Sequence, residues 1–483
     1  MSIDPGHVSH DRGAFMTIAR TAAPLYVTTL AASAGSLVDT ALLGRHATAS
    51  LAAFAVAVAV FAPATATVVG ALRGVMPFIA PHRENQDELL PLVRSGMWLA
   101  FAVGGVCAAV VAAVPFIGGL WGVRPAVLSQ LGPLPWLLAC SVLLIAVGGS
   151  ATSVLVALGH SAQVMRSGLV GTAVSVTLSV LLVGAPGPLP SLGLTGAGVA
   201  MLASSLISTG LNQLALRRRT VLRGRPLRPG RPEPRRVLRL AAVGIPLGGT
   251  VLVKFSVLGV LTFAAARIST DAAAVHGVSE SLVNIIFTAA VAVGQSTVPL
   301  IADCAARRDL PMIRRSVGAG VRVALSAVAV LGAALFALRV PVVGLFTTDP
   351  SLSHQVRGLL PLVLAVVVAD ALQAVAGFAL VGLRKTGPSL VSTAVWFGVL
   401  AAVAVPVADR YGLTGLWAAL AGANLLQAGT KTYSFLRHGR RIAGADPVAD
   451  QVADPVADPG PVSLIRTGGS SESTGRTAGG AQG

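Results

Sequence analysis

The sequence predicts an all-α polytopic membrane protein, with twelve transmembrane helices in two pseudo-twofold-related six-helix lobes around a central cavity. Composition, recurring apolar segments and an internal repeat predict this fold. Of the 483 residues, 54% are hydrophobic and 11% are charged, whereas a soluble domain carries about 25% charged residues. A bilayer tolerates an apolar exterior when each backbone polar group is paired within its own helix. The composition therefore argues against a soluble fold.

Apolar segments long enough to cross a membrane recur between short polar breaks. A helix that rises 1.5 Å per residue needs about 20 residues to cross the hydrocarbon core. Alternating strands of a β-barrel would give a different pattern. We expect helices at residues 15–43, 50–80, 89–115, 126–158, 162–184, 193–216, 238–266, 272–302, 312–338, 352–383, 388–408 and 413–436.

The two halves of the chain carry an internal repeat. Four short matches occur in the same order at a nearly constant offset, which is hard to obtain by chance even in a chain rich in Ala, Gly and Val. Because each half has an even number of helices, both halves keep one orientation, with a pseudo-twofold axis along the membrane normal. The matches are Gly193–Gly196 with Gly412–Gly415, Pro77–Ala80 with Pro299–Ala302, Thr172–Val174 with Thr393–Val395, and Val114–Pro115 with Val340–Pro341.

The excess of basic residues predicts topology rather than nucleic-acid binding. The net charge is +17, with 36 Lys and Arg against 19 Asp and Glu. Basic residues collect in alternate loops, as the positive-inside rule describes for cytoplasmic segments. We therefore expect a multi-pass protein of the cell inner membrane with both termini in the cytoplasm. The few basic residues on the opposite side are Arg45, Arg124, Arg267, Arg339, Arg357 and Arg410.

The chain divides almost evenly at a basic linker. Residues 217–236 hold nine Arg and four Pro, too charged and too broken to pack. We therefore expect a first lobe at 15–216 and a second lobe at 237–436. A cytoplasmic segment at 1–14 lacks the pattern of a cleavable signal. The repeats of Ala, Asp, Pro and Val and then of Gly, Ser and Thr predict a disordered cytoplasmic tail at 437–483.

The sequence favours neither catalysis nor a bound cofactor. The three cysteines show no C-x-x-C spacing, so neither a disulfide framework nor a zinc site is supported. Neither a zinc protease motif nor a P-loop is present, and no arrangement of nucleophile, base and acid emerges. We expect no enzyme activity, no cofactor and no metal site, and without a P-loop ATP is not the direct energy source.

Three stretches together resemble the multidrug and toxic compound extrusion (MATE) family of cation-coupled exporters, over roughly residues 15–436. The resemblance implies twelve helices in two lobes, with a cavity that faces alternately inward and outward. It also implies export driven by inward flow of Na⁺ or H⁺ through carboxylates inside the lobes. The stretches are Pro24–Gly44 with the segment Leu51–Pro63, Gly244–Pro246 with Ala272–Val278, and Ala369–Gly377 with Leu383–Lys385.

Asp39 is the first candidate for the coupling site. It lies late in the first helix, in S-L-V-D-T-A-L-L-G, at a position where the resemblance implies a coupling carboxylate. The alternative is an interfacial Asp near the helix end that pairs with Arg45. Intramembrane acids are functional by default, although depth matters.

Asp370 is the second candidate and lies well inside the tenth span. It matches the second-lobe aspartate of the family. Gln373, one helical turn on, could share its face. An Asp at this depth needs a partner even in a purely structural role, because an unpaired charge there is unfavourable by several kcal/mol.

Lys254 departs from the family pattern, in which some members carry a glutamate eight residues after Pro246. A sodium site needs oxygen ligands, and an ammonium only donates. We predict a pair of Lys254 with Asp370 or with Glu280, released when the acid is protonated. A fixed structural pair is equally consistent with the sequence.

Further polar residues give weaker signals. Glu280 and Asn284 share a face of the eighth helix with His276 and could line a cavity, or could lie wet near the outer end. The fifth helix offers hydroxyls rather than the Asn and Asp of archaeal-type members, which favours H⁺ over Na⁺. Arg73 and Arg322 lie close enough to cytoplasmic ends to snorkel, which leaves Lys254 as the only deep Lys or Arg.

The sequence and the resemblance together predict a secondary antiporter that exports organic, cationic or amphipathic small molecules in exchange for protons. The alternatives are a Na⁺-coupled exporter and a flippase of lipid-linked saccharides, whose cavity would be basic. A membrane scaffold or sensor would not need Asp39 and Asp370 inside apolar spans. Expected partners are a small-molecule substrate and membrane lipid, without nucleic acid, and the chain is expected to work as a monomer.

Overall fold

A computed structural model describes residues 5–46, 48–184, 192–219, 222, 230–347 and 349–444, and their regular structure is entirely helical. In this part of the chain, 11 helices are long and apolar enough to cross a membrane. The helical segment from Pro5 to Gly444 forms one compact unit. The expected all-helical membrane fold is confirmed.

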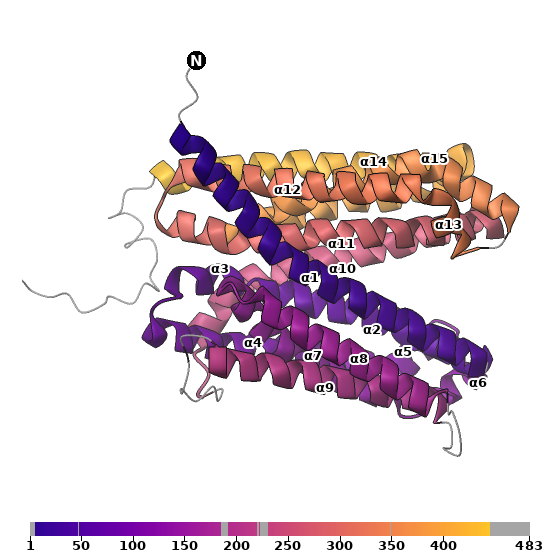
Figure 1. Cartoon of the computed structure of the whole chain (residues 1–483). Coiled ribbons are helices and arrows are strands. Elements are labelled where there is room, and N and C mark those ends of the chain that lie inside the picture. Colours follow the sequence, from indigo (N-terminus) through magenta and orange to yellow (C-terminus); the bar gives the residue numbers. More distant parts are fainter. Residues whose placement is uncertain are drawn as a thin grey trace, which may run out of the picture. The chain divides into compact units, whose positions relative to one another are not determined.

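The first half contributes six long helices and several short ones. Short helices follow the second and third long helices, where the chain turns at the two ends of the bundle (Figure 1). The elements are α1 (Pro5–His46), α2 (Thr48–Arg73), α3 (Met76–Ile79), the 3-10 helix η1 (Ala80–His82), α4 (Gln86–Ala112), α5 (Val114–Leu120), α6 (Pro125–Ser129), α7 (Leu134–Ala157), α8 (Ser161–Leu182) and α9 (Gly193–Arg219).

The second half repeats this plan. Its elements are α10 (Pro234–Ile268), α11 (Thr270–Ala306), α12 (Leu310–Ala337), α13 (Arg339–Gly344), α14 (Pro350–Gly382) and α15 (Gly387–Gly444). Inside α15, Gly412 has φ 62° and ψ −158°, a backbone conformation that breaks the helix into two. This region is accessible essentially only to glycine. The break falls between the expected helices at 388–408 and 413–436, so α15 supplies the eleventh and twelfth spans.

Several helix ends differ from the expected ones. The helix α1 begins at Pro5 rather than at 15, and proline suits a first helical position because its missing N–H has no partner there. The last helix continues to Gly444, past 436, while the rest of the expected tail lies outside the described residues. Part of the expected linker at 217–236 also lies outside them.

Polar residues at loop ends fix where several helices begin. Side-chain oxygens of Asn85, Ser269, Asp309 and Asp349 accept hydrogen bonds from backbone N–H groups in the first turns of α4, α11, α12 and α14. Each such cap satisfies a donor that has no partner in its own helix and stabilises the helix by about 1 kcal/mol. The turn sequences therefore fix where these four helices begin.

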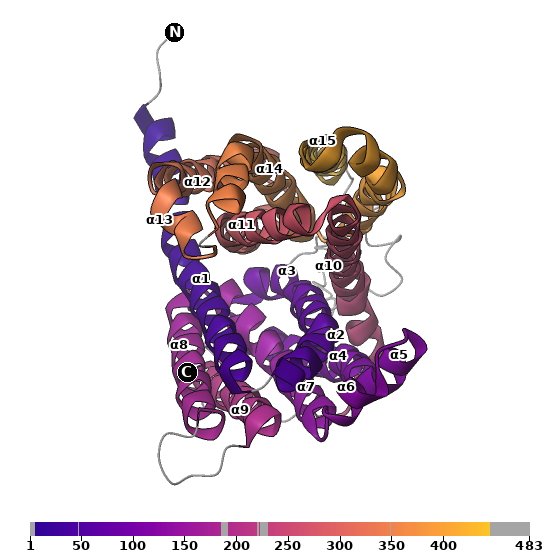
Figure 2. The same cartoon turned by 90° about the vertical axis from the view of Figure 1, so that its right-hand side faces the viewer.

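The packing of the two halves follows the repeat. In the first half α1 packs against α8, and in the second half α10 packs against α15. Each of these leading helices also reaches across, α1 to α11 and α12, and α10 to α2 and α4. Figures 1 and 2 show α1 and α10 in these crossing positions. The pseudo-twofold relation between the halves is thus visible in their contacts.

Glycine allows the two halves to touch directly. A Cβ atom added to Gly74, just after α2, would lie 2.5 Å from the Cα of Gly244 in α10. Only two glycines can bring backbones this close. This contact brings α2 and α10 together close to a cavity between the halves.

Candidate functional site

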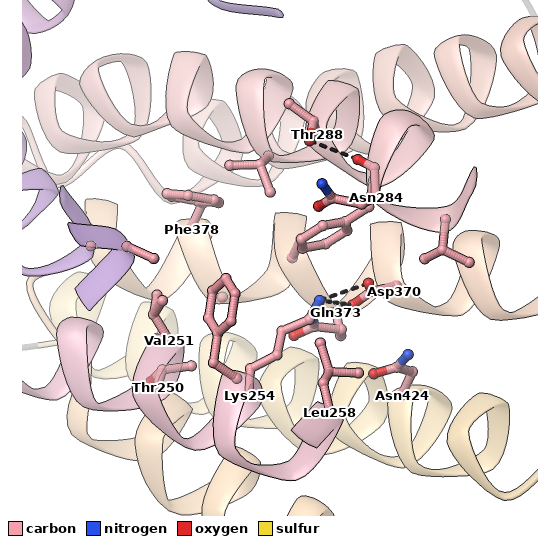
Figure 3. Close-up of a pocket in the computed structure, with 18 of the residues that line it drawn as sticks. Thr250, Val251, Lys254, Leu258, Asn284, Thr288, Asp370, Gln373, Phe378 and Asn424 are labelled. Atoms are coloured by element: carbon pink, nitrogen blue, oxygen red, sulfur yellow. Dashed lines mark hydrogen bonds and ion pairs between the residues drawn. The ribbon is translucent and has the colours of Figure 1, made fainter. Parts of the chain in front are cut away.

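A cavity of about 510 Å³ is lined by α1 and α2 of the first half and by α10, α11, α14 and α15 of the second. Its walls are mainly apolar and include five aromatic side chains. A few polar and charged groups converge inside it (Figure 3). A mostly apolar cavity with few convergent polar groups is the usual form of a small-molecule site. The aromatic residues are Phe255, Phe287, Phe378, Phe397 and Trp417.

The cavity contains a close ion pair between Lys254 of α10 and Asp370 of α14. The Lys254 Nζ lies 2.7 Å and 2.9 Å from the two carboxylate oxygens of Asp370, as Figure 3 shows. Asp370 is 2% exposed, and the Lys254 ammonium stands 3.4 Å from the centroid of the Phe287 ring. Of the two partners predicted for Lys254, the structure therefore pairs it with Asp370.

A chain of hydrogen bonds extends from this pair across α14 and α15. The Gln373 Nε2 donates to Asp370 Oδ1 at 2.7 Å, and Gln373 Oε1 accepts from Lys431 Nζ at 2.5 Å. Lys431 also donates to Gln427 Oε1 at 3.2 Å, and that oxygen accepts from Thr393 Oγ1 at 2.9 Å. Gln373 is therefore the bridge between the predicted pair and a second lysine.

Lys431 corrects the expectation that Lys254 is the only deep Lys or Arg. It lies in α15, is 1% exposed and lines the same cavity. Sequence reasoning passed over it because it lies close to the basic end of the last helix. One signal could have found it: Gln427 precedes it by one helical turn and Asn424 by two, so three polar residues share a face of the last helix.

Arg73 is a second correction. It was expected to snorkel at a cytoplasmic end, but it lines the cavity from the last turn of α2. Its guanidinium carbon lies 5.8 Å from the centroid of the Phe378 ring, and its Nε is buried without a hydrogen-bond partner. Its guanidinium faces the Phe378 ring in the cavity, at an end of α2 that packs against α10.

The polar stripe on α11 lines the cavity, which is one of the two alternatives that the sequence leaves open. His276, Glu280 and Asn284 all line it, and Figure 3 shows Asn284 among the lining side chains. His276 is 1% exposed and makes an edge contact with Trp417, with ring centroids 5.6 Å apart. The alternative of a wet stripe does not hold for His276. Its Nε2 lies 3.8 Å from a Glu280 carboxylate oxygen.

Asp39 lies apart from the cavity, inside the first half. It is 4% exposed, and Ser179 Oγ of α8 donates to its Oδ1 at 2.5 Å. Neither residue lines the cavity, so the structure does not bring the two predicted aspartates together. The side chain of Arg45, the alternative partner of Asp39, lies outside the described residues.

Polar ties join the two halves at the end of the bundle that carries α3, called here the α3 end (Figure 1). The Arg83 guanidinium lies 2.9 Å from a carboxylate oxygen of Asp303 at the end of α11. Arg384, after α14, donates twice to the Pro77 carbonyl oxygen, at 3.1 Å and 3.3 Å, and stacks 4.5 Å from the Phe78 ring centroid. These contacts link the two halves at the α3 end.

Arg384 has an unusual backbone for a residue with a side chain. Its φ is 58°, in the left-handed region, whereas the corresponding turn after α7 places Gly159 there with φ 80°. Both turns end their helix with the same pair of backbone hydrogen bonds, to Val381 and Leu380 after α14. A non-glycine residue is strained by about 1 kcal/mol in this region, so the contacts of the Arg384 side chain must offset that strain.

Comparison with known proteins decides the family. The MatE family model matches residues 246–407. A probable multidrug resistance protein NorM of Deinococcus radiodurans is 30% identical over 424 residues, which cover 82% of this chain and 90% of the relative. The chain belongs to the MatE family. A second probable NorM protein, of Aromatoleum aromaticum, is 29% identical over 399 residues, with 78% of this chain and 82% of the relative covered.

A solved MatE-like fold is also similar. A transporter of the MOP superfamily from Pyrococcus furiosus, described by a binding pocket of reverse polarity that suggests a different function, superposes with a TM-score of 0.80. It is 16% identical and covers 89% of this chain and 97% of its own. MatE membership makes this chain a multi-pass membrane efflux transporter and not an enzyme. The resemblance found in the sequence is confirmed.

Proposed function

We propose that this MatE protein exports organic small molecules by alternating access in exchange for protons. The observation that carries the proposal is the Lys254–Asp370 pair, 2.7 Å apart, inside an apolar cavity between the two halves. The sequence and its family resemblance predict cationic or amphipathic substrates. The aromatic walls beside a charged cluster favour an amphipathic substrate, with an apolar body and a polar or charged group.

The pair gives the cavity a way to respond to protons. Two opposite charges in an apolar cavity are tolerated because each compensates the other. A proton on Asp370 removes one of the two charges, and Lys254 then loses its partner and is free to move. A ligand that competes for the Asp370 carboxylate is linked to that proton, because each binds less tightly in the presence of the other.

The surroundings of both carboxylates favour protons over Na⁺. Sodium would need oxygen ligands, but the oxygens of Asp370 face the donors of Lys254 and Gln373. Ser179 donates to Asp39 and supports the carboxylate without adding a negative charge. We propose Asp370 and Asp39 as the coupling sites, one in the cavity and one in the first half.

In this proposal the protein lies in the cell inner membrane, with the α3 end and both termini on the cytoplasmic side. The distribution of Lys and Arg supports this orientation. The Arg83–Asp303 and Arg384–Pro77 ties would then close the cytoplasmic side. Alternating access requires these ties to break when the cavity opens inward.

Transport in everted membrane vesicles tests the proposal. A cationic amphipathic dye should accumulate only when a pH gradient is imposed, and an equal Na⁺ gradient should have no effect. Asp370→Asn and Asp39→Asn should abolish accumulation although both variants reach the membrane. Arg267→Met, which removes an exposed charge at the far end of α10, is the control. Accumulation driven by Na⁺ alone would contradict the proton assignment.

A flippase of lipid-linked saccharides is the second candidate, because the cavity is more basic than the sequence suggested. Arg73, Lys254 and Lys431 all line it, and basic groups could hold a pyrophosphate. Reconstituted protein that moves a lipid-linked saccharide between leaflets, with no dye transport, would favour this candidate over the exporter.

A further inference from the structure

Lys431 is a buried lysine without a direct acidic partner. In the described part of the chain its Nζ contacts only two amide oxygens, Gln373 Oε1 at 2.5 Å and Gln427 Oε1 at 3.2 Å. Asp370 is reached only through Gln373, and its carboxylate oxygens already face Lys254. Asp370 therefore contacts Lys254 directly and Lys431 only through Gln373.

The contacts of Lys431 are compatible with both a charged and a neutral amine. An ammonium carries three donors, whereas a neutral amine carries two donors and a lone pair. The two amide oxygens match the two donors of the neutral form. In the charged form the third N–H donor has no hydrogen-bond partner among the described residues, so its proton can leave while both contacts are kept.

The neighbouring charges make the state of Lys431 sensitive to a ligand. Asp370 on α14 and Lys254 on α10 both act electrostatically on Lys431, with opposite signs. Arg73 on α2 and His276 and Glu280 on α11 line the same cavity, while no residue of α12 lines it in the described part of the chain. A cation that enters this space adds a positive charge beside three basic groups.

We infer that Lys431 carries an exchangeable proton, which a cationic substrate displaces when it occupies the cavity. The inference rests on the proposed function and adds a carrier other than the two aspartates. Lysine suits this role because it can lose its proton in an apolar site, whereas arginine stays charged. The proton returns to Nζ when the substrate leaves, so the two cations occupy the cavity in turn.

Proton release on ligand binding tests the inference directly. The probe is tetraphenylphosphonium, a cation without a titratable proton, added to the purified full chain in detergent with a pH-indicator dye in weak buffer. The wild type should release protons as the probe binds, and its affinity should rise with pH. Lys431→Met should still bind the probe, but should release fewer protons than the wild type and show a shallower pH dependence, because only the aspartates remain linked to binding.

Two further substitutions separate proton exchange from simple packing. Lys431→Gln keeps a donor for the amide oxygens and covers the case in which Lys431→Met does not fold; it should behave as Lys431→Met is expected to. Lys431→Arg keeps a permanent charge, so its probe binding should not strengthen with pH and should be weaker than that of the wild type by about tenfold or more at high pH. Arg267→Met should match the wild type.

The possible results divide cleanly. Unchanged proton release in Lys431→Met or Lys431→Gln would overturn the inference. If proton release is lost only in Asp370→Asn, the aspartate is the carrier and the proposed function stands. Probe binding in Lys431→Arg equal to the wild type at high pH would also overturn the inference. A wild type that does not bind the cation would contradict both the inference and export of cations.

Discussion

At the scale of single residues, the Lys254–Asp370 pair makes a prediction about stability. Asp370→Asn should lower the free energy of unfolding by about 3 kcal/mol, because it leaves a lysine in an apolar cavity without its carboxylate. Lys254→Met should also be destabilising. The double variant should be less destabilised than the sum of the two single variants, as thermal unfolding of the purified protein can measure. Strict additivity would show that the two charges do not interact.

Ser179 makes a second prediction at this scale. Its hydroxyl donates to Asp39 at 2.5 Å, so Ser179→Ala should destabilise the protein by about 1 kcal/mol and reduce proton-driven transport. Ser175 is also buried on α8, one turn earlier, and Ser175→Ala is the matched control. Equal transport by the two variants would show that this hydrogen bond has no part in coupling.

The candidate site could be predicted from sequence only in part. Asp370, Lys254, Gln373 and Asn284 were identified because an isolated polar residue in an apolar span is conspicuous. Lys431 was missed because its position near a basic helix end hid its depth. Whether Lys254 pairs with Asp370 or Glu280 depends on how α10, α11 and α14 pack, and the local sequence does not determine that packing.

At the scale of elements, the break in α15 depends on one glycine. Gly412→Ala should destabilise the protein by about 1–3 kcal/mol, because its φ of 62° with ψ of −158° strains any residue that has a side chain. Gly422 lies in the helical part of the same element, with open space where a Cβ would stand. Gly422→Ala should instead be neutral or stabilising by about 0.5–1 kcal/mol. Thermal unfolding compares the two, and equal effects would contradict the role given to the break.

The helices themselves are largely predictable from the sequence. The repeated Gly-Leu-Thr-Gly segments mark the expected helix starts at 193 and 413, and in the structure α9 begins at Gly193 and α15 breaks at Gly412. Apolar length predicts a span directly, because the hydrocarbon thickness fixes the number of residues. Helix ends were less accurate. The sequence predicts one continuous helix at 50–80, but α2 ends at Arg73 and the chain continues as the short helix α3. The interruption lies where Gly74 and Gly244 bring two backbones together.

At the scale of the whole bundle, the tie between Arg83 and Asp303 should control which side of the cavity opens. The pair is partly exposed, with side-chain exposures of 49% and 17%, so its effect on stability should be below about 1 kcal/mol. Arg83→Glu should nevertheless weaken closure of the α3 end, because it places two carboxylates together. The double exchange Arg83→Glu with Asp303→Arg should restore it.

The native thiol of Cys304 reports on this end. It follows Asp303 directly and is partly buried. In a background in which Cys107 and Cys140 are replaced by alanine, maleimide should label Cys304 faster in Arg83→Glu than in the parent. The double exchange should return the rate to that of the parent. Identical labelling rates in all three proteins would show that the ion pair does not hold this end closed.

Arg384 keeps its contact with Pro77 although its backbone conformation is one that favours glycine. The chain accepts a left-handed arginine after α14 where the turn after α7 uses glycine. Arg384→Gly would relax the backbone but delete the link to Pro77 and the stacking on Phe78 that offset the strain, so its net effect on stability should be small. Such a variant would stay folded and lose turnover, so the arginine at this turn serves the moving contact between the halves rather than the turn itself.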